Sequence, residues 1–291
     1  MSLWQHIGER IRAETGVAVR AVRDAVGGGC INEAVRVPGE GRDFFVKLNA
    51  AAKADMFAAE AEGLCTLAGT RTVRVPEPVC WGVAGDTAYL VLEHLAFGRG
   101  GSGAVLGEQL AALHRVTQAG FGWHRDNTIG STPQINTPCA DWLAFWRERR
   151  LGYQLRLAER NGWGGELQRL GERLLVEMDA LFENYRPQPS LLHGDLWSGN
   201  HGYLADGRPV IFDPAVYFGD READLAMTEL FGGFGGNFYA GYRAAWPLDP
   251  GYVSRKTFYN LYHILNHLNL FGGGYHGQAL RMLQQLLAEL R

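Results

Sequence analysis

The residue types with the clearest chemical use lie in two short segments, residues 191–200 and 210–213. The first reads Leu-Leu-His-Gly-Asp-Leu-Trp-Ser-Gly-Asn, and the second is an apolar run that ends in an acid, Val-Ile-Phe-Asp. Phosphotransferases use one Asp to orient and deprotonate a hydroxyl, and a nearby Asn and a second Asp to hold magnesium on the nucleotide phosphates. The pattern therefore predicts Asp195 as the catalytic base and Asn200 and Asp213 as magnesium ligands.

The chemistry of the cation explains these residue types. Magnesium prefers oxygen ligands in near-octahedral geometry, and carboxylate and amide oxygens supply them. The bound charge then offsets the negative charge that develops on the transferred phosphoryl group. His-Gly-Asp alone is also a common turn sequence, but the spacing to Asn200 and the strand that ends in Asp213 favour the phosphotransfer interpretation.

A glycine-rich segment near the N-terminus predicts a turn that covers phosphate groups. Residues 27–32 read Gly-Gly-Gly-Cys-Ile-Asn and lie between two expected strands. Glycines let backbone N–H groups approach phosphate oxygens closely. A plain hairpin is the alternative, because the segment matches neither Gly-x-Gly-x-x-Gly nor a P-loop. Its place before a strand that ends in a lysine favours nucleotide binding, for which we predict Gly28, Gly29, Cys30 and Asn32.

Lys47 follows the apolar run Phe-Phe-Val and is one of only three lysines in the chain. In kinase-like sites such a lysine binds the α- and β-phosphates and is held by a glutamate on a helix. Glu60 shares a helix face with Leu64 and Leu67, which should point at the core, whereas Glu62 lies roughly 160° further round the helix. We predict that Glu60 pairs with Lys47; the alternative is a solvated lysine at a strand end.

Other polar residues near these motifs are predicted to support the site. His193 is expected to brace the loop rather than to transfer protons, since it lies two residues from Asp195 at the end of an apolar strand. Asp220 is expected to cap the helix that follows, where acids in the first turn suit the helix dipole. Asp224 is expected to tether the catalytic loop, and His114 is expected to have a packing or capping role.

The elements that must position these residues change character along the chain. The first third is rich in strands and the remainder is mostly helical. This order predicts an α+β, bilobal protein-kinase-like fold, with a nucleotide-binding lobe over residues 1–95 and a catalytic and acceptor-binding lobe over residues 96–291. The glycine-rich residues 98–103 are expected to form a linker or mobile loop. The expected strands are 17–22, 33–37, 43–48 and 89–93, with short ones near Leu191 and Val210, and the expected helices are 4–15, 54–67, 104–117, 139–160, 165–184, 221–231, 252–270 and 275–290.

The composition is that of an ordinary globular protein of 291 residues, which is long enough for two lobes. The net charge is -3, so no nucleic-acid partner is expected. No apolar run reaches the roughly 18 residues of a membrane span, and the first residues lack the pattern of a signal peptide. The four cysteines have no metal-ligand spacing. We expect a cytoplasmic protein with no membrane association.

With these motifs in hand, the chain resembles the fructosamine kinases, also called ketosamine-3-kinases, which are related to aminoglycoside and choline kinases. The resemblance rests on residues 28–32, 45–49, 93–95, 121–123, 126–127, 130–136, 193–200 and 212–215. It implies phosphorylation, with ATP and Mg²⁺, of the 3-hydroxyl of a ketosamine such as a ribulosamine, erythrulosamine or fructosamine. The carrier would be a small amine or a glycated protein, and because the product releases the amine, the implied role is deglycation.

The resemblance also implies roles for residues outside the catalytic motifs. The backbone of Glu93, His94 and Leu95 would form a hinge that receives the adenine. Trp197 follows the catalytic Asp and is typical of this family. We expect its indole ring to pack against the sugar of the acceptor, with the filling of a gap between the catalytic loop and the helices as the alternative.

Cys30 is a candidate redox site. It lies in the glycine turn among backbone N–H groups and near Lys47, an environment that lowers the pKa of a thiol. The family resemblance implies redox sensitivity at this position. We therefore expect either a monomer or a homodimer linked by a disulfide between two copies of Cys30; the alternative is a small residue tolerated in a turn.

Two other functions fit parts of the sequence. An aminoglycoside or choline phosphotransferase would need an acidic pocket for its cationic acceptor, but residues 231–291 contain only two acids, Asp249 and Glu289, among many aromatic residues. Such a wall suits a largely neutral sugar better than a polycation. A nucleotide-binding pseudokinase is disfavoured because the phosphate-binding lysine, the base and both metal ligands are all present.

Overall fold

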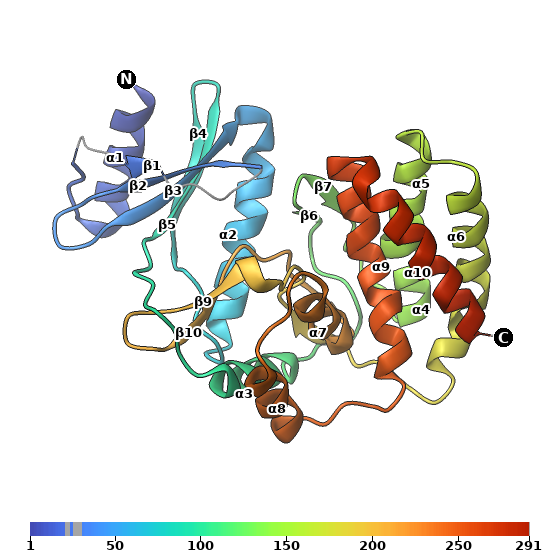
Figure 1. Cartoon of the computed structure of the whole chain (residues 1–291). Helices are drawn as coiled ribbons and strands as arrows, with labels where there is room; N and C mark the ends of the chain where they lie inside the picture. The colour runs from blue at the N-terminus through green and yellow to red at the C-terminus, as the bar shows by residue number, and fades with distance from the viewer. Residues whose placement is uncertain (21–23, 26–30, 291) are drawn as a thin grey trace. The chain divides into compact units, whose positions relative to one another are not determined.

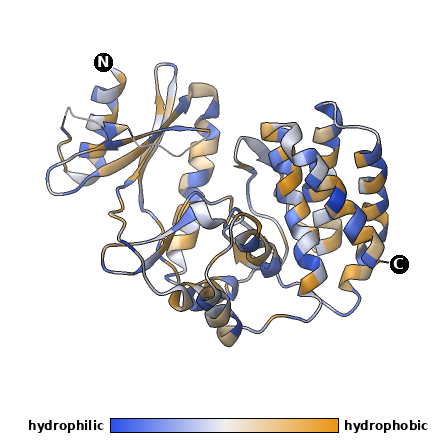
Figure 2. Ribbon diagram, in the orientation of Figure 1, coloured by the Kyte–Doolittle hydropathy of each residue, from blue (hydrophilic) through white to orange (hydrophobic). Residues whose placement is uncertain are grey.

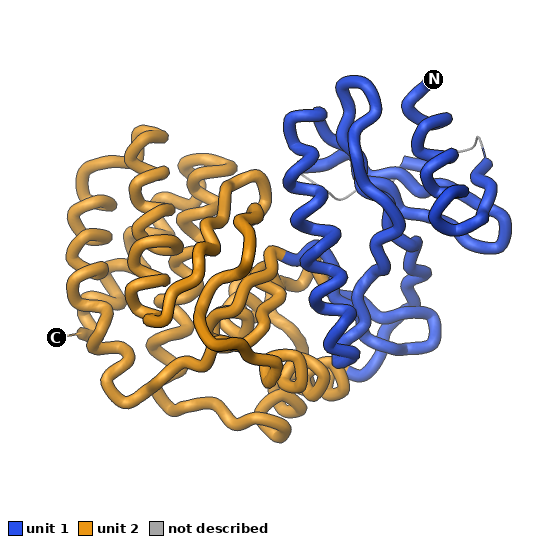
Figure 3. The backbone as a smooth tube through the Cα atoms, turned by 180° about the vertical axis from the view of Figure 1, so that it is seen from behind, with its two compact units in different colours: residues 1–102, 201–214 blue, residues 103–200, 215–291 orange. Residues whose placement is uncertain are grey.

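The computed structural model describes residues 1–20, 24–25 and 31–290, and its internal contacts divide the chain into two compact units (Figures 1 and 3). Unit 1 comprises residues 1–102 and 201–214, and unit 2 comprises residues 103–200 and 215–291. The single division expected after residue 95 differs from this in two ways. The glycine-rich residues up to Ser102 belong to unit 1, and a later segment of the chain returns to it.

Unit 1 is built on a five-stranded antiparallel sheet with the strand order β1-β2-β3-β5-β4. Helix α1 (Leu3–Thr15) packs against one face of this sheet and α2 (Ala54–Gly69) lies along the other (Figure 1). The strands are β1 (Asp24–Ala25), β2 (Glu33–Val37), β3 (Phe44–Ala50), β4 (Pro78–Ala84) and β5 (Thr87–Glu93).

The sequence of β3 explains how the sheet presents its lysine. Successive side chains of a strand point to opposite faces. Phe44, Val46 and Leu48 therefore face α1 and join its Ile11 in the core, whereas Lys47 points to the face that α2 covers. The expected strand at residues 17–22 is wrong for residues 17–20, of which only Val19 forms an isolated bridge, with Gly39. Residues 21 and 22 lie outside the described ones.

The chain that leaves β5 packs on a hairpin formed by β9 (His201–Tyr203) and β10 (Pro209–Ile211). The N–H of Gly98 donates to the carbonyl of Tyr203 at 2.8 Å, and a Cβ added at Gly101 would lie 2.3 Å from the carbonyl oxygen of Gly207. The glycine-rich segment is therefore docked within unit 1, because its lack of side chains allows this close approach.

Unit 2 is mainly helical, and its longest helix, α9, is buried along most of its length. Figure 2 shows apolar and polar residues interspersed along the surrounding helices, as expected for helices with one buried face. None of the helices that the structure describes combines the length and apolarity of a membrane span. The helices are α3 (Gly103–His114), α4 (Trp142–Trp146), α5 (Gly152–Arg160), α6 (Glu166–Glu177), α7 (Arg221–Leu230), α8 (Gly236–Ala245), α9 (Tyr252–Phe271) and α10 (His276–Glu289).

Two small antiparallel pairs complete unit 2. Strands β6 (Asn127–Ile129) and β7 (Thr132–Gln134) form a hairpin, and β8 (Ser190–Leu192) pairs with β11 (Tyr217–Gly219). The pairing of β8 with β11 fixes the segment that begins at His193. This segment carries the expected catalytic motif.

Candidate active site

Lys47 in unit 1 lies between two carboxylates. Its Nζ donates to Glu60 Oε1 at 2.6 Å and to Asp213 Oδ1 at 2.7 Å. The expected pairing of Lys47 with Glu60 is confirmed, and the helical period that selected Glu60 over Glu62 accounts for it. The contact with Asp213 joins residues 166 positions apart and was not predicted.

These contacts determine the charge of the lysine. Burial by itself lowers the pKa of an ammonium group, but the nearby carboxylates of Asp213 and Glu60 raise the pKa of Lys47 above its usual value. Lys47 is therefore a fixed positive charge at physiological pH. Its side chain is 7% exposed, which leaves little freedom to move away from this position.

Asp213 has an unusual backbone conformation. Its φ is +58°, in the left-handed region that residues other than glycine seldom occupy. Asp tolerates this region better than most residues, but the conformation still costs on the order of 1 kcal/mol or more. Such strain is concentrated at functional sites in proteins, and here it directs a carboxylate onto Lys47.

The catalytic loop in unit 2 brings Asp195 and Asn200 together. Asn200 Nδ2 donates to the backbone carbonyl of Asp195 at 2.8 Å and approaches its Oδ2 at 3.4 Å. The N–H of Asp195 donates to His193 Nδ1 at 3.3 Å, so His193 braces the loop as expected. Asn200 is buried, whereas Asp195 is partly exposed.

The glycine of His-Gly-Asp is required by the turn. Gly194 has a φ of +85°, and a Cβ at this position would lie 2.0 Å from the carbonyl oxygen of Ala215. Any side chain would thus displace the strand connection that follows Asp213. The N–H of Ala215 also donates to the carbonyl of His193 at 2.8 Å, which ties the two segments together.

Asp224 of α7 tethers the catalytic loop, as predicted. Its Oδ2 accepts the N–H of His193 at 2.7 Å, and its Oδ1 accepts the N–H of Gly194 at 2.8 Å. His114 Nε2 lies 3.2 Å from the same carboxylate, and its Nδ1 lies 2.8 Å from the Tyr242 hydroxyl. Burial opposes ionisation of Asp224, but the hydrogen bond from His114 and those from the loop hold its pKa below the usual value.

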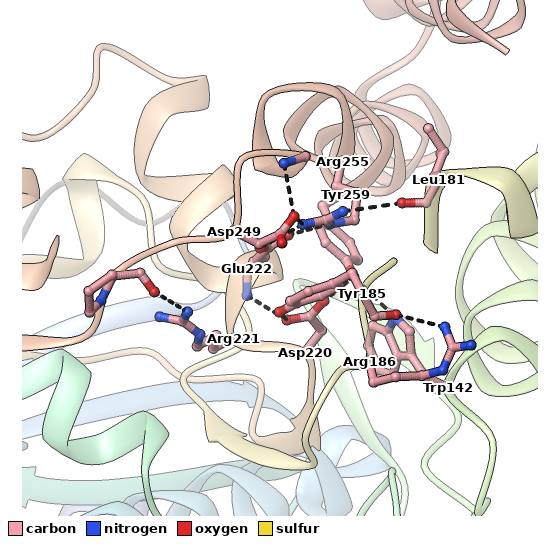
Figure 4. A network of polar contacts seen from close by, with 12 residues as sticks. Trp142, Leu181, Tyr185, Arg186, Asp220, Arg221, Glu222, Asp249, Arg255 and Tyr259 are labelled. Atoms are coloured by element: carbon pink, nitrogen blue, oxygen red, sulfur yellow. Dashed lines mark hydrogen bonds and ion pairs between the residues drawn. The ribbon is translucent and has the colours of Figure 1, made fainter. Parts of the chain in front are cut away.

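The first turn of α7 is held by a buried polar network (Figure 4). Asp220 caps the helix as expected: it accepts the N–H of Glu222 at 3.0 Å and also the hydroxyls of Tyr185 at 2.9 Å and Tyr259 at 2.5 Å. Glu222 forms a two-pronged ion pair with Arg255 of α9. These contacts fix the start of α7 and therefore the position of Asp224 one turn later.

Acid should weaken unit 2 through His263. Burial lowers the pKa of this imidazole to about 3, against roughly 6.5 in an unfolded chain. The unfolded state then binds more protons, so the free energy of unfolding should fall as the pH drops below about 6.5, by up to about 1.4 kcal/mol per pH unit. Denaturant unfolding of the wild type and of His263→Leu between about pH 4.5 and 7 measures this.

The wild type must be compared with His263→Leu because Glu222 changes the pH dependence of stability in the opposite direction. Burial and the neighbouring Asp220 raise the pKa of Glu222 to about 7, so its carboxyl group binds more protons in the folded than in the unfolded state. Through Glu222, the free energy of unfolding therefore falls as the pH rises. The slope attributed to His263 is the difference between wild type and His263→Leu. Identical slopes for the two proteins would contradict the prediction.

The hinge residues have more structural roles than the sequence predicted. Within unit 1, the N–H of Glu93 donates to the backbone carbonyl of Glu77 at 2.9 Å, and the N–H of His94 donates to the backbone carbonyl of Asp43 at 3.1 Å. The Glu93 carboxylate accepts the Glu77 N–H at 2.8 Å. The N–H groups of Glu93 and His94 thus already have partners within unit 1, and the adenine contact expected of the backbone of residues 93–95 stays a prediction.

The structure describes only the last two residues of the glycine-rich segment 27–32. Gly28, Gly29 and Cys30 lie outside the described residues, so their expected roles in phosphate binding and redox chemistry stay predictions. Asn32 is described, and its Oδ1 accepts the Nδ2 of Asn49 at 2.8 Å. This contact links the start of β2 to the end of β3, a structural role in addition to the nucleotide contact that we expected.

The segment 130–136, typical of the resembled family but given no role from the sequence, positions the residues after Asp213. Gln134 Nε2 donates to the carbonyl of Ala215 at 3.0 Å, and its Oε1 accepts the hydroxyl of Tyr262 at 2.9 Å. The buried Arg150 donates to Asn136 Oδ1 at 2.7 Å. The sequence pattern held no signal of this role, because it does not show that Gln134 and Asn136 are buried; once buried, both amides must be hydrogen-bonded.

Trp197 lies at the surface of the catalytic loop in unit 2. Its side chain is 37% exposed, and a Cβ at Gly199 would lie 2.3 Å from its ring. The ring therefore folds back over the loop and still offers part of its area to solvent. It is edge-to-face with Phe231, with the ring centroids 6.2 Å apart.

Comparisons with known proteins give a consistent result. The sequence model of the fructosamine kinase family matches residues 3–289. A Synechocystis protein named "Probable ketoamine kinase" is 50% identical over 288 residues, which is 98% of this chain and 97% of that protein. A chloroplastic protein-ribulosamine 3-kinase of Arabidopsis thaliana is 45% identical over 92% of this chain and 83% of its own length.

Solved structures agree on the fold. A Haemophilus somnus 129PT crystal structure, provisionally named a fructosamine-3-kinase, has a TM-score of 0.89 and 30% identity over 98% of this chain and 97% of its own. An aminoglycoside phosphotransferase has a TM-score of 0.63 at 15% identity, over 97% of this chain and 98% of that one, and shares the fold alone. The expected α+β, protein-kinase-like fold is confirmed.

Proposed function

We propose that this chain, which belongs to the fructosamine kinase family, transfers the γ-phosphoryl group of ATP to the 3-hydroxyl of a ketosamine. The observation that carries the proposal is the catalytic loop: Asp195 is held by Asn200, on a turn tethered by Asp224. Such a loop holds a carboxylate ready to orient an alcohol and accept its proton. The ribulosamine 3-kinase name of the Arabidopsis relative makes a ribulosamine the first substrate to test.

The residues of unit 1 are proposed to bind the nucleotide. Lys47, held by Glu60, would pair with the α- and β-phosphates. The N–H of Leu95 is the hinge donor that we assign to the adenine. A cavity of about 340 Å³ within unit 1 is lined by Phe97, two residues after Leu95 in the sequence, and by Phe212 among others. These rings offer aromatic surface to the adenine.

The residues proposed as metal ligands fit magnesium by their chemistry. Asn200 uses its amide nitrogen on Asp195, so the amide oxygen is its coordinating atom. Asp213 offers a carboxylate that is 46% exposed. Both atoms are hard oxygen donors of the kind that Mg²⁺ takes. When bound, the cation would neutralise charge on the nucleotide phosphates.

Asp213→Ala and Asn200→Ala should raise the magnesium concentration needed for half-maximal rate. We expect a shift of roughly 10- to 100-fold for Asp213→Ala and a smaller one for Asn200→Ala, because only the first removes a charge. Excess magnesium should partly rescue Asn200→Ala. Rates measured across a magnesium titration provide the test.

Asp206→Ala is the matched control for these variants. Asp206 is an exposed acid in the turn of the β9–β10 hairpin, paired with Arg208 at 2.7 Å. Its loss should leave the magnesium dependence unchanged. A metal site elsewhere is indicated if all three variants follow the wild-type titration.

The substrate class is tested by ATP consumption. Ribulose-, erythrulose- and fructose-lysine are compared with choline and kanamycin at equal concentrations. We expect turnover with a ketosamine and background rates with choline and kanamycin, because residues 231–291 contain few acids to bind a polycation. A higher kcat/KM for kanamycin or choline would replace the proposal by the aminoglycoside- or choline-kinase alternative.

A further inference from the structure

An aromatic row begins in the catalytic loop and continues along unit 2. Trp197 contacts Phe231, and the ring centroid of Phe231 lies 4.8 Å from that of His267. The His267 ring is in turn 5.4 Å from Phe271 and 5.2 Å from Tyr275. We call these five rings the aromatic row. Its exposed members are Trp197, at 37%, and Phe271, at 51%, and the other three rings are half-buried.

The aromatic row is distinct from the aromatic core of α9. His267 and Phe271 are four residues apart and therefore share one face of the helix. Tyr259 and Tyr262 lie in the same helix, are buried, and use their hydroxyls inside unit 2. Packing of the core thus does not account for the outer end of the row, where Phe271 is exposed.

The row offers rings rather than charges to a ligand. Burial lowers the pKa of His267, and its Nδ1 lies 2.8 Å from the backbone carbonyl of His263, so it is a neutral imidazole that donates this hydrogen bond. Of the two acids between residues 231 and 291, Asp249 is paired with Arg255 at 2.6 Å. Aromatic faces bind apolar chains and, by cation–π attraction, ammonium groups.

We propose that the aromatic row binds the amine carrier of the acceptor, the part of a ketosamine that is not sugar. The inference rests on the proposed function. In a ketosamine made from an alkylamine, the sugar is followed by a secondary ammonium group and then by methylene groups. With the sugar hydroxyl at Asp195, the ammonium group would lie near Trp197, two residues along, and the methylene chain would follow the row toward Phe271.

The length of the carrier chain provides the test. Ketosamines of ribulose with methylamine and with hexylamine differ only in the methylene groups that the row would cover. For the wild-type enzyme we expect a KM about five- to tenfold lower with the hexylamine compound, at similar kcat, as partial burial of several methylene groups implies. Phe271→Ala and Tyr275→Ala should each reduce this ratio to about twofold or less and leave the KM of the methylamine compound unchanged.

Val253→Ala is the matched control. Val253 is 73% exposed and lies in the first turn of the same helix, and its replacement should keep the wild-type ratio. Thermal unfolding of each variant establishes that it is folded. Equal KM values for the two compounds with the wild type, or equal changes of both in Phe271→Ala, would overturn the inference while the proposed function stands. If the wild type phosphorylated neither compound, the proposed function would fail and the inference with it.

Discussion

Asp195→Asn should reduce kcat by about 10²- to 10⁴-fold, the contribution typical of a general base. The variant keeps the shape of the side chain, and Asn200 still has the backbone carbonyl of residue 195 to bind. It loses the carboxylate that orients the acceptor hydroxyl and accepts its proton. Steady-state rates with a ribulosamine acceptor give the kcat, and titration with ATP in the absence of acceptor gives the nucleotide affinity, which should hardly change.

Asp179→Asn serves as the control for this variant. Asp179 is a surface acid of unit 2 that pairs with Arg147, and surface pairs of this kind contribute little. Its kcat should equal that of the wild type. Turnover of Asp195→Asn within a factor of two of wild type would remove Asp195 from the catalytic role.

Asp224→Asn should destabilise the protein by about 3 kcal/mol and lower kcat at the same time. The two carboxylate oxygens of Asp224 accept separate N–H groups, from His193 and Gly194. An amide has only one accepting oxygen, so one buried N–H would face an NH₂ group in either orientation. Unpaired buried groups cost about 1–3 kcal/mol, and the loss of a buried charge from such a cluster costs more.

Two measurements distinguish whether Asp224 positions the catalytic loop or only stabilises the fold. Denaturant unfolding gives the change in stability, and kcat under conditions where the variant is fully folded reports the position of Asp195. Glu177→Gln, which removes a partly exposed pair with Arg173 at 2.7 Å, should cost less than about 1 kcal/mol and leave kcat intact. A destabilised Asp224→Asn enzyme with wild-type kcat would show that the tether does not position the catalytic loop.

Local periodicity predicted the parts of the site that depend on neighbours in sequence. The 3.6-residue period chose Glu60 over Glu62 for the contact with Lys47, and the structure confirms that contact. The spacing within the catalytic loop placed Asn200 near Asp195, which is also confirmed. The chemical roles of these residues stay proposals, because the contacts alone do not demonstrate binding or catalysis.

Contacts between distant segments were beyond the reach of the sequence pattern. Nothing in the sequence near Asp213 indicates that its carboxylate accepts a hydrogen bond from Lys47, 166 residues away, or that its φ is positive. Strand β4 was missed because its Pro, Cys and Gly interrupt the alternation by which half-buried strands are recognised. Gln134 had no role predicted from its sequence, although it is buried and donates to the carbonyl of Ala215.

The division of unit 1 between two stretches of chain has a consequence for biosynthesis. Its first stretch ends at Ser102, but the β9–β10 hairpin and Asp213 emerge from the ribosome only after about a hundred further residues, at roughly 5–20 residues per second. Until then Lys47 has Glu60 as its partner but lacks Asp213. We therefore expect the nascent first unit to stay incompletely packed while residues 103–200 of the second unit are made.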